Sequence, residues 1–167
     1  MSFEAGKKLE NLLPVAALLN EENILPAPAG ADKAAVIRLA LASLCRTRGL
    51  AEEKSIADKI LERESGICTT LETGLSLPHA RLKGLAAPCA GMVLVPSGIP
   101  EPQEPELLIK LVFLFLSPDK QEFFAEHLKI LRSAASLLRA PLIDEVASAG
   151  SAREALARLK AAEGGRA

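Results

Sequence analysis

The chain has 167 residues, of which 49% are hydrophobic, and its 20 basic and 21 acidic side chains give a formal net charge of -1. This apolar content suffices for one sizeable core, so we expect a single domain over residues 1–167 with its core at about 12–162. A charge so close to zero lacks the basic field that neutralises a phosphate backbone, and nucleic acid is therefore not an expected partner.

Other features of the composition exclude further classes. Five Phe without Trp or Tyr leave few stacking platforms for bases or sugar rings. The longest apolar run, residues 111–116, is far shorter than the roughly 20 residues of a membrane span, and the N-terminus has no signal core. We therefore expect a cytoplasmic protein with no direct membrane insertion. Cys45, Cys68 and Cys89 are too widely spaced to indicate disulfides or a thiolate zinc site.

The predicted elements begin with a helical stretch and an extended segment before a longer helix. Residues 12–20 are apolar at helical spacing, and residues 22–28 then favour extended backbone because each Pro restricts its predecessor. A helix is predicted from Asp32, a suitable N-cap, to about residue 48, where Gly49 can end it.

A second helix is predicted from residue 51 or 52 to about 65, with Gly66 as its terminator, and it places Arg63 in its last turn. Residues 67–71 are β-branched and rich in Thr, which favours a strand. A turn at Thr73 and Gly74 then leads to an extended segment that puts His79 on a strand end or loop.

Two strands follow, at residues 90–96 and 107–116. The second is apolar nearly throughout, as expected for a central strand covered on both faces. Residues 97–106 between the strands are rich in Pro and Glu and predict an irregular connection.

The last part of the chain predicts helices. Ser117 and Pro118 favour a helix start, with a capping hydroxyl followed by Pro at the first position. The apolar stripe of that helix is expected to contain Phe124, Leu128, Leu131, Ala135 and Leu138. Pro141 interrupts it, and two shorter helices are predicted at 142–149 and 152–162, before a C-terminal tail that should fray.

His79 is the main candidate for chemistry. It is one of only two histidines, and it lies outside the predicted helices in residues 74–81, which read Gly-Leu-Ser-Leu-Pro-His-Ala-Arg. A neutral imidazole is a nucleophile near pH 7, and a reversible phosphoryl carrier needs that property. It also needs a cation to offset the phosphoryl charge, and Arg63 and Arg81 are the candidates.

These motifs resemble a known family. Residues 61–64 (Leu-Glu-Arg-Glu), the 74–81 motif, the apolar strand at 111–116 and the His127-Leu-Lys-Ile-Leu segment are similar to the enzyme IIA family of the mannitol/fructose type, from the phosphoenolpyruvate-dependent phosphotransferase system. The layout is closest to the standalone nitrogen-regulatory enzyme IIA. The resemblance spans about residues 12–159, and it implies a three-layer α/β/α sandwich with a small mixed β-sheet flanked by helices.

The resemblance also implies roles. His79 corresponds to the phosphorylated histidine, with its outer (ε) nitrogen reacting, Arg63 to the residue that stabilises the phosphoryl group, and His127 to a second site histidine. No cofactor is implied. The expected partners are a histidine phosphocarrier protein (HPr or its nitrogen-branch homologue), followed by an enzyme IIB or by a regulated transporter or kinase. Residues 65–73, which are less rich in Gly, and the Pro-rich residues 96–105 depart from the family pattern.

Several alternatives remain open. No IIB or membrane segment is visible, which favours a regulatory phosphotransferase over a fructose or mannitol enzyme IIA, and a third reading is an interaction module that is not phosphorylated. Arg63 is equally typical of a helix C-terminus, and His127 of a partly buried packing histidine. Arg81 and Ser76 are candidate binding residues, although a solvated arginine and a strand serine are commoner. The two histidines lack a third ligand, so no metal is expected.

Overall fold

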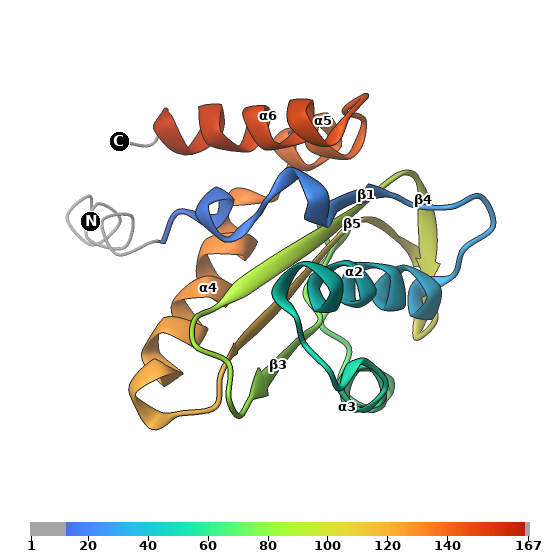
Figure 1. Cartoon of the computed structure of the whole chain (residues 1–167). Helices are drawn as coiled ribbons and strands as arrows, with labels where there is room; N and C mark the ends of the chain where they lie inside the picture. The colour runs from blue at the N-terminus through green and yellow to red at the C-terminus, as the bar shows by residue number, and fades with distance from the viewer. Residues whose placement is uncertain (1–12, 166–167) are drawn as a thin grey trace, which may run out of the picture.

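The structure, a computed structural model, describes residues 13–165. Leu12, where the first helix was predicted to begin, and the last two residues of the tail lie outside this range. A mixed five-stranded sheet lies between two layers of helices (Figure 1), which confirms the predicted α/β/α sandwich.

The sheet places His79 beside its central strand. Its strands are β1 (Ile24–Pro26), β2 (Leu75–Ser76), β3 (His79–Leu82), β4 (Cys89–Glu101) and β5 (Glu104–Pro118). Their order is β1-β4-β5-β2, with β3 also pairing with β5. β4 and β5 are antiparallel and the other pairs are parallel, so β2 and β3 follow one another along the outer side of β5.

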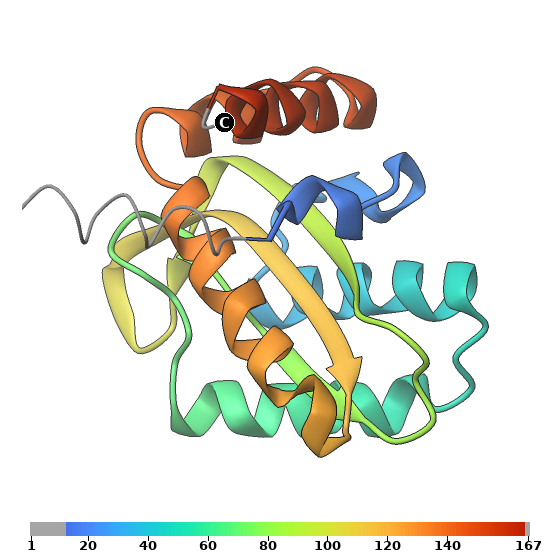
Figure 2. The ribbon, with the colours of Figure 1, turned by 90° about the vertical axis from the view of Figure 1, so that its left-hand side faces the viewer.

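Helices cover both faces of the sheet (Figures 1 and 2). α2 (Lys33–Arg48) and α3 (Glu53–Gly66) pack on one face. The other face carries the 3₁₀ turn η1 (Val15–Leu18) together with α4 (Phe124–Leu137), α5 (Leu142–Ala147) and α6 (Ala152–Gly164). Two further 3₁₀ turns, η2 (Glu21–Asn23) and η3 (Gln121–Phe123), precede β1 and α4.

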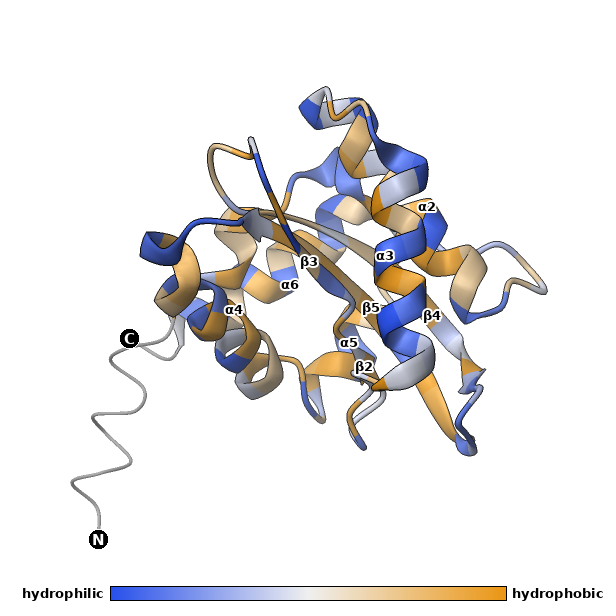
Figure 3. Cartoon of the chain, turned by 90° about the horizontal axis from the view of Figure 1, so that it is seen from below, coloured by the Kyte–Doolittle hydropathy of each residue, from blue (hydrophilic) through white to orange (hydrophobic). Residues whose placement is uncertain are grey.

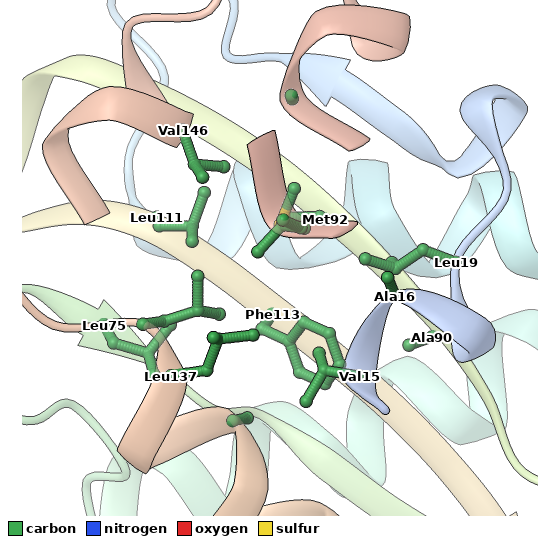
Figure 4. Packing of buried hydrophobic residues seen from close by; sticks show 14 of the residues in the cluster. Val15, Ala16, Leu19, Leu75, Ala90, Met92, Leu111, Phe113, Leu137 and Val146 are labelled. Carbon is green, nitrogen blue, oxygen red and sulfur yellow. The ribbon is translucent and has the colours of Figure 1, made fainter. Parts of the chain in front are cut away.

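The core has two halves because successive side chains of a strand point to opposite faces. Along β5, Phe113 belongs to the half under α4–α6, while Val112 belongs to the half under α2 and α3. Figure 4 shows the Phe113 ring between Leu137 and Val15 in the first half. The apolar colour follows β4 and β5 in Figure 3, whereas much of α3 is hydrophilic. A strand buried on both faces explains the unbroken apolar run at residues 111–116.

Local signals in the sequence were sufficient to predict both ends of α2. The Asp32 side chain accepts a hydrogen bond from the backbone N–H of Ala35 at 2.8 Å, as an N-cap does. Gly49 adopts φ 67°, the left-handed conformation that ends many helices. α3 ends one residue later than predicted, since Gly66 is still helical, and Arg63 lies in its last turn as expected.

In three segments the secondary structure differs from the one predicted. Residues 13–20 contain only the 3₁₀ turn η1, because Pro14 and a cluster of long-range contacts replace a regular helix there. Residues 67–71 form no strand, and only Thr70 makes an isolated bridge to Ser76. The connection predicted at 97–106 is instead the far end of the β4–β5 hairpin, with its tip at Pro102 and Gln103.

The hairpin tolerates its prolines because β1 pairs only with Met92–Leu94. Beyond Leu94 no strand of the described chain pairs with the outer side of β4. Pro96 and Pro100, which lack an N–H group, therefore leave no acceptor of a neighbouring strand unpaired on that side. The register also shifts between Leu94 and Ile99, which marks an irregularity in the pairing.

The start of α4 was predicted wrongly, and its buried face was predicted only in part. Ser117 is not a helix cap, because Ser117 and Pro118 still pair with β3 as the last residues of β5. The buried face of α4 consists of His127, Ile130, Ser133, Ala134 and Leu137. Of the predicted stripe, Leu138 is buried and Leu131 and Ala135 pack against the core. Phe124 and Leu128, assigned to the same stripe, have 49% and 44% of their surface exposed.

Pro141 separates α4 from α5, as predicted, and the last two helices lie at the expected positions with small shifts of their ends. Of the helices in the described part of the chain, none combines the length and the apolar character needed to cross a bilayer.

Candidate functional site

The site is built around His79, the first residue of β3. β3 pairs with β5 in a register that sets His79 opposite Phe115, and both side chains belong to the face under α4. The two rings stack, with centroids 5.2 Å apart and planes 13° from parallel. Only 5% of His79 is exposed. The imidazole is therefore held flat against the core by strand pairing and by packing.

One hydrogen bond determines which nitrogen of the His79 ring carries the proton. Its Nδ1 lies 2.8 Å from the carbonyl oxygen of Leu77. A carbonyl can only accept, so Nδ1 carries the proton in the neutral ring and Nε2 keeps its lone pair. Nε2 is buried and has no hydrogen-bond partner in the described structure. The ring thus presents an unused nucleophilic nitrogen.

His127 joins the site from α4. Its ring is 5.1 Å from that of His79, in an edge-on arrangement at 62°, and 5.1 Å from that of Phe115. Its Nδ1 lies 2.5 Å from the buried hydroxyl of Ser117. This contact could not be predicted from the sequence, because Ser117 next to Pro118 has the pattern of a helix cap.

Both histidines are neutral at pH 7. Burial lowers the pKa of His79 below its ordinary 6.5, against the opposing effect of the Leu77 hydrogen bond, and the charge of Arg63 lowers it further. Burial also lowers the pKa of His127, to about 4, with help from His79, Arg81 and Arg63. Neutral imidazole is the nucleophilic form, so the site is ready to react at neutral pH without losing a proton first.

Arg63 comes from the opposite layer of the sandwich. It lies in the last turn of α3, exposed to solvent, and its positive charge acts on both His79 and His127. No ion pair or hydrogen bond of its guanidinium is found among residues 13–165. It is therefore free to receive an anion next to His79, and a guanidinium can donate two parallel hydrogen bonds to phosphate oxygens.

The other two predicted binding residues lie differently. Arg81 donates to the carbonyl of Lys120 at 2.8 Å and covers the ring of Phe124, with Cζ 5.3 Å from its centroid, so its guanidinium is already engaged. Ser76 pairs with Val112, whose side chain packs toward α2 and α3, and this register puts Ser76 on the sheet face opposite to His79. The structure thus brings Arg63 and His127 to His79, keeps Arg81 at the margin and separates Ser76.

Within residues 13–165, no three His, Cys, Asp or Glu side chains are arranged so that they could hold a metal ion. The chemistry available to this site is that of a neutral imidazole beside an unpaired guanidinium. Such a pair suits the reversible binding of a small, doubly charged group.

Comparison with known proteins gives a family and a set of similar folds. The sequence profile described as "Phosphoenolpyruvate-dependent sugar phosphotransferase system, EIIA 2" matches residues 17–162. Comparison with curated protein sequences gives no match.

Two solved structures illustrate the likeness of fold. The nitrogen regulatory protein IIA-Ntr from Neisseria meningitidis is 21% identical with a TM-score of 0.73, over 87% of this chain and 98% of that one. The mannitol IIA from Escherichia coli is 23% identical with a TM-score of 0.69, over 84% and 98%.

A third structure contains a partner. It is a complex of the mannitol enzyme IIA and phosphorylated enzyme IIB from Escherichia coli, and its similarity to this chain is 22% identity and a TM-score of 0.69, over 86% of this chain and 97% of that chain.

Proposed function

The chain belongs to the EIIA 2 family of the phosphoenolpyruvate-dependent sugar phosphotransferase system, and we propose that it carries the phosphoryl group of that system on Nε2 of His79. The observation that supports this most directly is the hydrogen bond from Nδ1 to the Leu77 carbonyl, which leaves Nε2 as the free nitrogen. The expected donor is a histidine phosphocarrier protein, HPr or its nitrogen-branch homologue.

The proposed step is an in-line transfer between two nitrogens. The lone pair of His79 Nε2 attacks the phosphorus, the new N–P bond forms, and the N–P bond of the donor histidine breaks and returns its electron pair to that ring. The proton on Nδ1 stays in its hydrogen bond to Leu77, so His79 neither gains nor loses a proton. Because Nε2 is buried, the side chains above it have to move aside when the donor docks.

Two neighbours stabilise the transferred group in this proposal. Arg63 offsets its negative charge from the α3 side by charge-assisted hydrogen bonds. His127 faces it from the α4 side. With the Ser117 hydroxyl donating to Nδ1, the proton of neutral His127 is on Nε2, where it can donate to a phosphoryl oxygen.

For the next step we propose the regulatory branch, in which the phosphorylation state of the protein controls a bound transporter or kinase in the cytoplasm. The alternative is transfer to a cysteine of an enzyme IIB, and the likeness to a mannitol enzyme IIA that forms such a complex favours testing it. Incubating the phosphorylated protein with purified fructose and mannitol enzymes IIB separates the two: loss of the phosphoryl group to an enzyme IIB would establish the sugar branch.

The carrier step is tested by incubating the protein with phosphoenolpyruvate, enzyme I and a histidine phosphocarrier protein, and following acid-labile phosphorylation by intact mass. We expect one phosphoryl group on the wild type and none on His79→Ala. Arg63→Ala should be phosphorylated about 100-fold more slowly, as expected on loss of one stabilising group in a transition state.

Arg46→Ala is the matched control, because Arg46 is also an exposed arginine in the last turn of a helix. It should react at the wild-type rate. A phosphoryl group that persists in His79→Ala would contradict the assignment of His79. A wild type that no phosphocarrier protein phosphorylates would favour the interaction module instead.

A further inference from the structure

A cluster of three charged side chains is buried where α2, α3 and the tip of the β4–β5 hairpin meet. Lys33 Nζ lies 2.9 Å from Glu64 Oε2 and 2.8 Å from Glu101 Oε2. The three residues have only 5%, 5% and 1% of their surface exposed. They link three elements that are far apart in the sequence.

The remaining polar atoms of the cluster are also engaged. The Thr70 hydroxyl donates to Glu101 at 2.6 Å, and the Thr69 hydroxyl donates to Glu64. Burial disfavours the charged form of Lys33, but hydrogen bonds to the two carboxylates outweigh it and the pKa of Lys33 is raised. Burial is likewise outweighed at Glu101, whose pKa is lowered. Lys33 and Glu101 are therefore both charged at pH 7.

Stability alone is a weak reason for such a cluster. The desolvation of buried charges roughly offsets their attraction, and well-packed apolar residues often serve as well. In some proteins, buried ionic groups instead select one particular geometry. The geometry fixed here concerns two residues of the candidate site.

The first connection leads to Arg63. Glu64 follows it directly in the last turn of α3, so any restraint on Glu64 also restrains the backbone of Arg63. The side chain of Gln103, at the hairpin tip, donates to the carbonyls of Glu64 and Ser65 at 3.0 and 2.9 Å. The last turn of α3 is thus held from α2 by Lys33 and from the hairpin by Gln103.

The second connection leads to His79. The backbone N–H of Leu77 donates to the carbonyl of Thr69 at 3.2 Å. The carbonyl of the same Leu77 accepts the bond from His79 Nδ1 at 2.8 Å. Thr69, whose hydroxyl and N–H both bind Glu64, therefore joins the cluster to the segment that orients the imidazole.

We propose that the Lys33–Glu64–Glu101 cluster, acting through Thr69, is a positioning device that sets the Arg63 guanidinium relative to His79. This inference rests on the proposed function. Lys33, Glu64, Glu101 and Thr69 are positioning residues that do not touch the phosphoryl group. Their effect arises because small misplacements of a charge partner weaken its contribution to the transition state.

The test uses Thr69→Val, because removing Lys33 would leave two buried carboxylates without a counter-charge and could unfold the region. Valine has the shape of threonine and keeps the backbone contact to Leu77, but it cannot bind Glu64. We expect phosphorylation by the histidine phosphocarrier protein to become about tenfold slower, with the rate restored in Thr69→Ser. Thr47→Val is the matched control, since Thr47 is a partly buried threonine whose hydroxyl binds Asn23 and Ser43 away from the cluster.

A double-mutant cycle separates positioning from general stability. If Thr69 acts mainly by setting Arg63, Thr69→Val should slow the reaction clearly less in Arg63→Ala than in the wild type. Equal slowing in both backgrounds, or a loss of rate in Thr47→Val that matches the one in Thr69→Val, would overturn the proposal. A wild type that is not phosphorylated at all would instead refute the proposed function.

An NMR measurement on the unphosphorylated protein gives an outcome independent of the reaction. The Nδ1–H of His79 should exchange with water faster in Thr69→Val than in the wild type or Thr47→Val, because its acceptor Leu77 is held less firmly. Unchanged exchange together with an unchanged rate would show that the cluster has no part in positioning.

Discussion

Each of the two site histidines makes one buried hydrogen bond through Nδ1. At His79 a backbone carbonyl holds the proton on Nδ1, and at His127 the Ser117 hydroxyl lies against Nδ1. The two rings thus have different roles although they are in contact. In the proposed function, Nε2 of His79 provides a lone pair, and Nε2 of His127 provides a donor when the Ser117 hydroxyl donates to Nδ1.

This difference can be tested by removing the hydroxyl. In Ser117→Ala the Nδ1 of His127 loses its donor, so we expect a mixture of both neutral tautomers where the wild type has mainly Nε2–H. The ¹⁵N chemical shifts of the ring measure this directly. Ser133→Ala is the control, because Ser133 is also buried on α4 but binds the backbone of Leu13. Identical His127 shifts in Ser117→Ala and the wild type would contradict the assigned role.

The low pKa of His127 predicts how stability depends on pH. An unfolded histidine has a pKa near 6.5, and His127 in the folded protein has one of about 4. Between these values the unfolded chain binds more protons, so the free energy of unfolding falls as the pH is lowered from 6.5 toward 4. His127 should account for about 2–3 kcal/mol of that loss at pH 4.5.

Urea unfolding at pH 7 and pH 4.5 measures this contribution. The loss of stability between the two pH values should be smaller in His127→Asn than in the wild type, because asparagine does not titrate. His79, whose pKa is also lowered, remains in both proteins and contributes in the same direction. An equal loss in both proteins would show that His127 titrates normally.

At the scale of elements, the sequence of α4 is compatible with more than one buried helix face. Its apolar residues form two overlapping stripes, and packing against the sheet selects the one with Ile130 and Leu137. Leu128, on the other stripe, stays 44% exposed. The periodicity predicts that a helix exists but cannot decide between faces that are one residue apart.

Substitution of one residue from each stripe distinguishes the two faces. Ile130→Ala should lower the free energy of unfolding by about 2–5 kcal/mol, because it leaves a cavity in a fully buried position. Leu128→Ala should change it by less than about 1 kcal/mol. Denaturant unfolding of both variants gives the comparison, and equal losses would place both residues in the core.

Features determined by residues close together in the sequence were easier to predict than features determined by residues far apart. The caps of α2 are local, and both Asp32 and Gly49 were predicted correctly. The hairpin across residues 97–106 is an exception, because Ile99 pairs with nearby Ile109, but its Pro residues favoured the prediction of an irregular connection. Within the site, the motif singled out His79 and Arg63, but the contacts made by Leu77 and Ser117 follow only from the folded arrangement of β3, β5 and α4.

At the scale of the whole molecule, the two ends of the described chain are tied together. The Glu163 carboxylate, in α6, accepts hydrogen bonds from the N–H groups of Val15 and Ala16 at 2.7 and 2.9 Å. The two N–H groups belong to buried residues, so water cannot readily replace the carboxylate as their hydrogen-bond acceptor. One side chain therefore joins the first and last elements over the same face of the sheet.

Glu163→Ala should lower the free energy of unfolding by about 1–3 kcal/mol, because it leaves two buried donors unpaired. Glu163→Gln keeps one acceptor oxygen in place and should lose less. Thermal unfolding of the two variants ranks them. Similar melting temperatures for Glu163→Ala and the wild type would show that the link does not contribute.

The candidate site draws on both layers of the sandwich, since Arg63 comes from α3 on one face, His127 from α4 on the other, and His79 from the strand between them. No short peptide contains all three residues. A fragment that contains only the 74–81 motif can therefore resemble the family in sequence and still lack the arginine and the second histidine of the candidate site. For distant relatives, the informative question is whether the motif is accompanied by an arginine and a histidine at the two remote positions that folding brings to it.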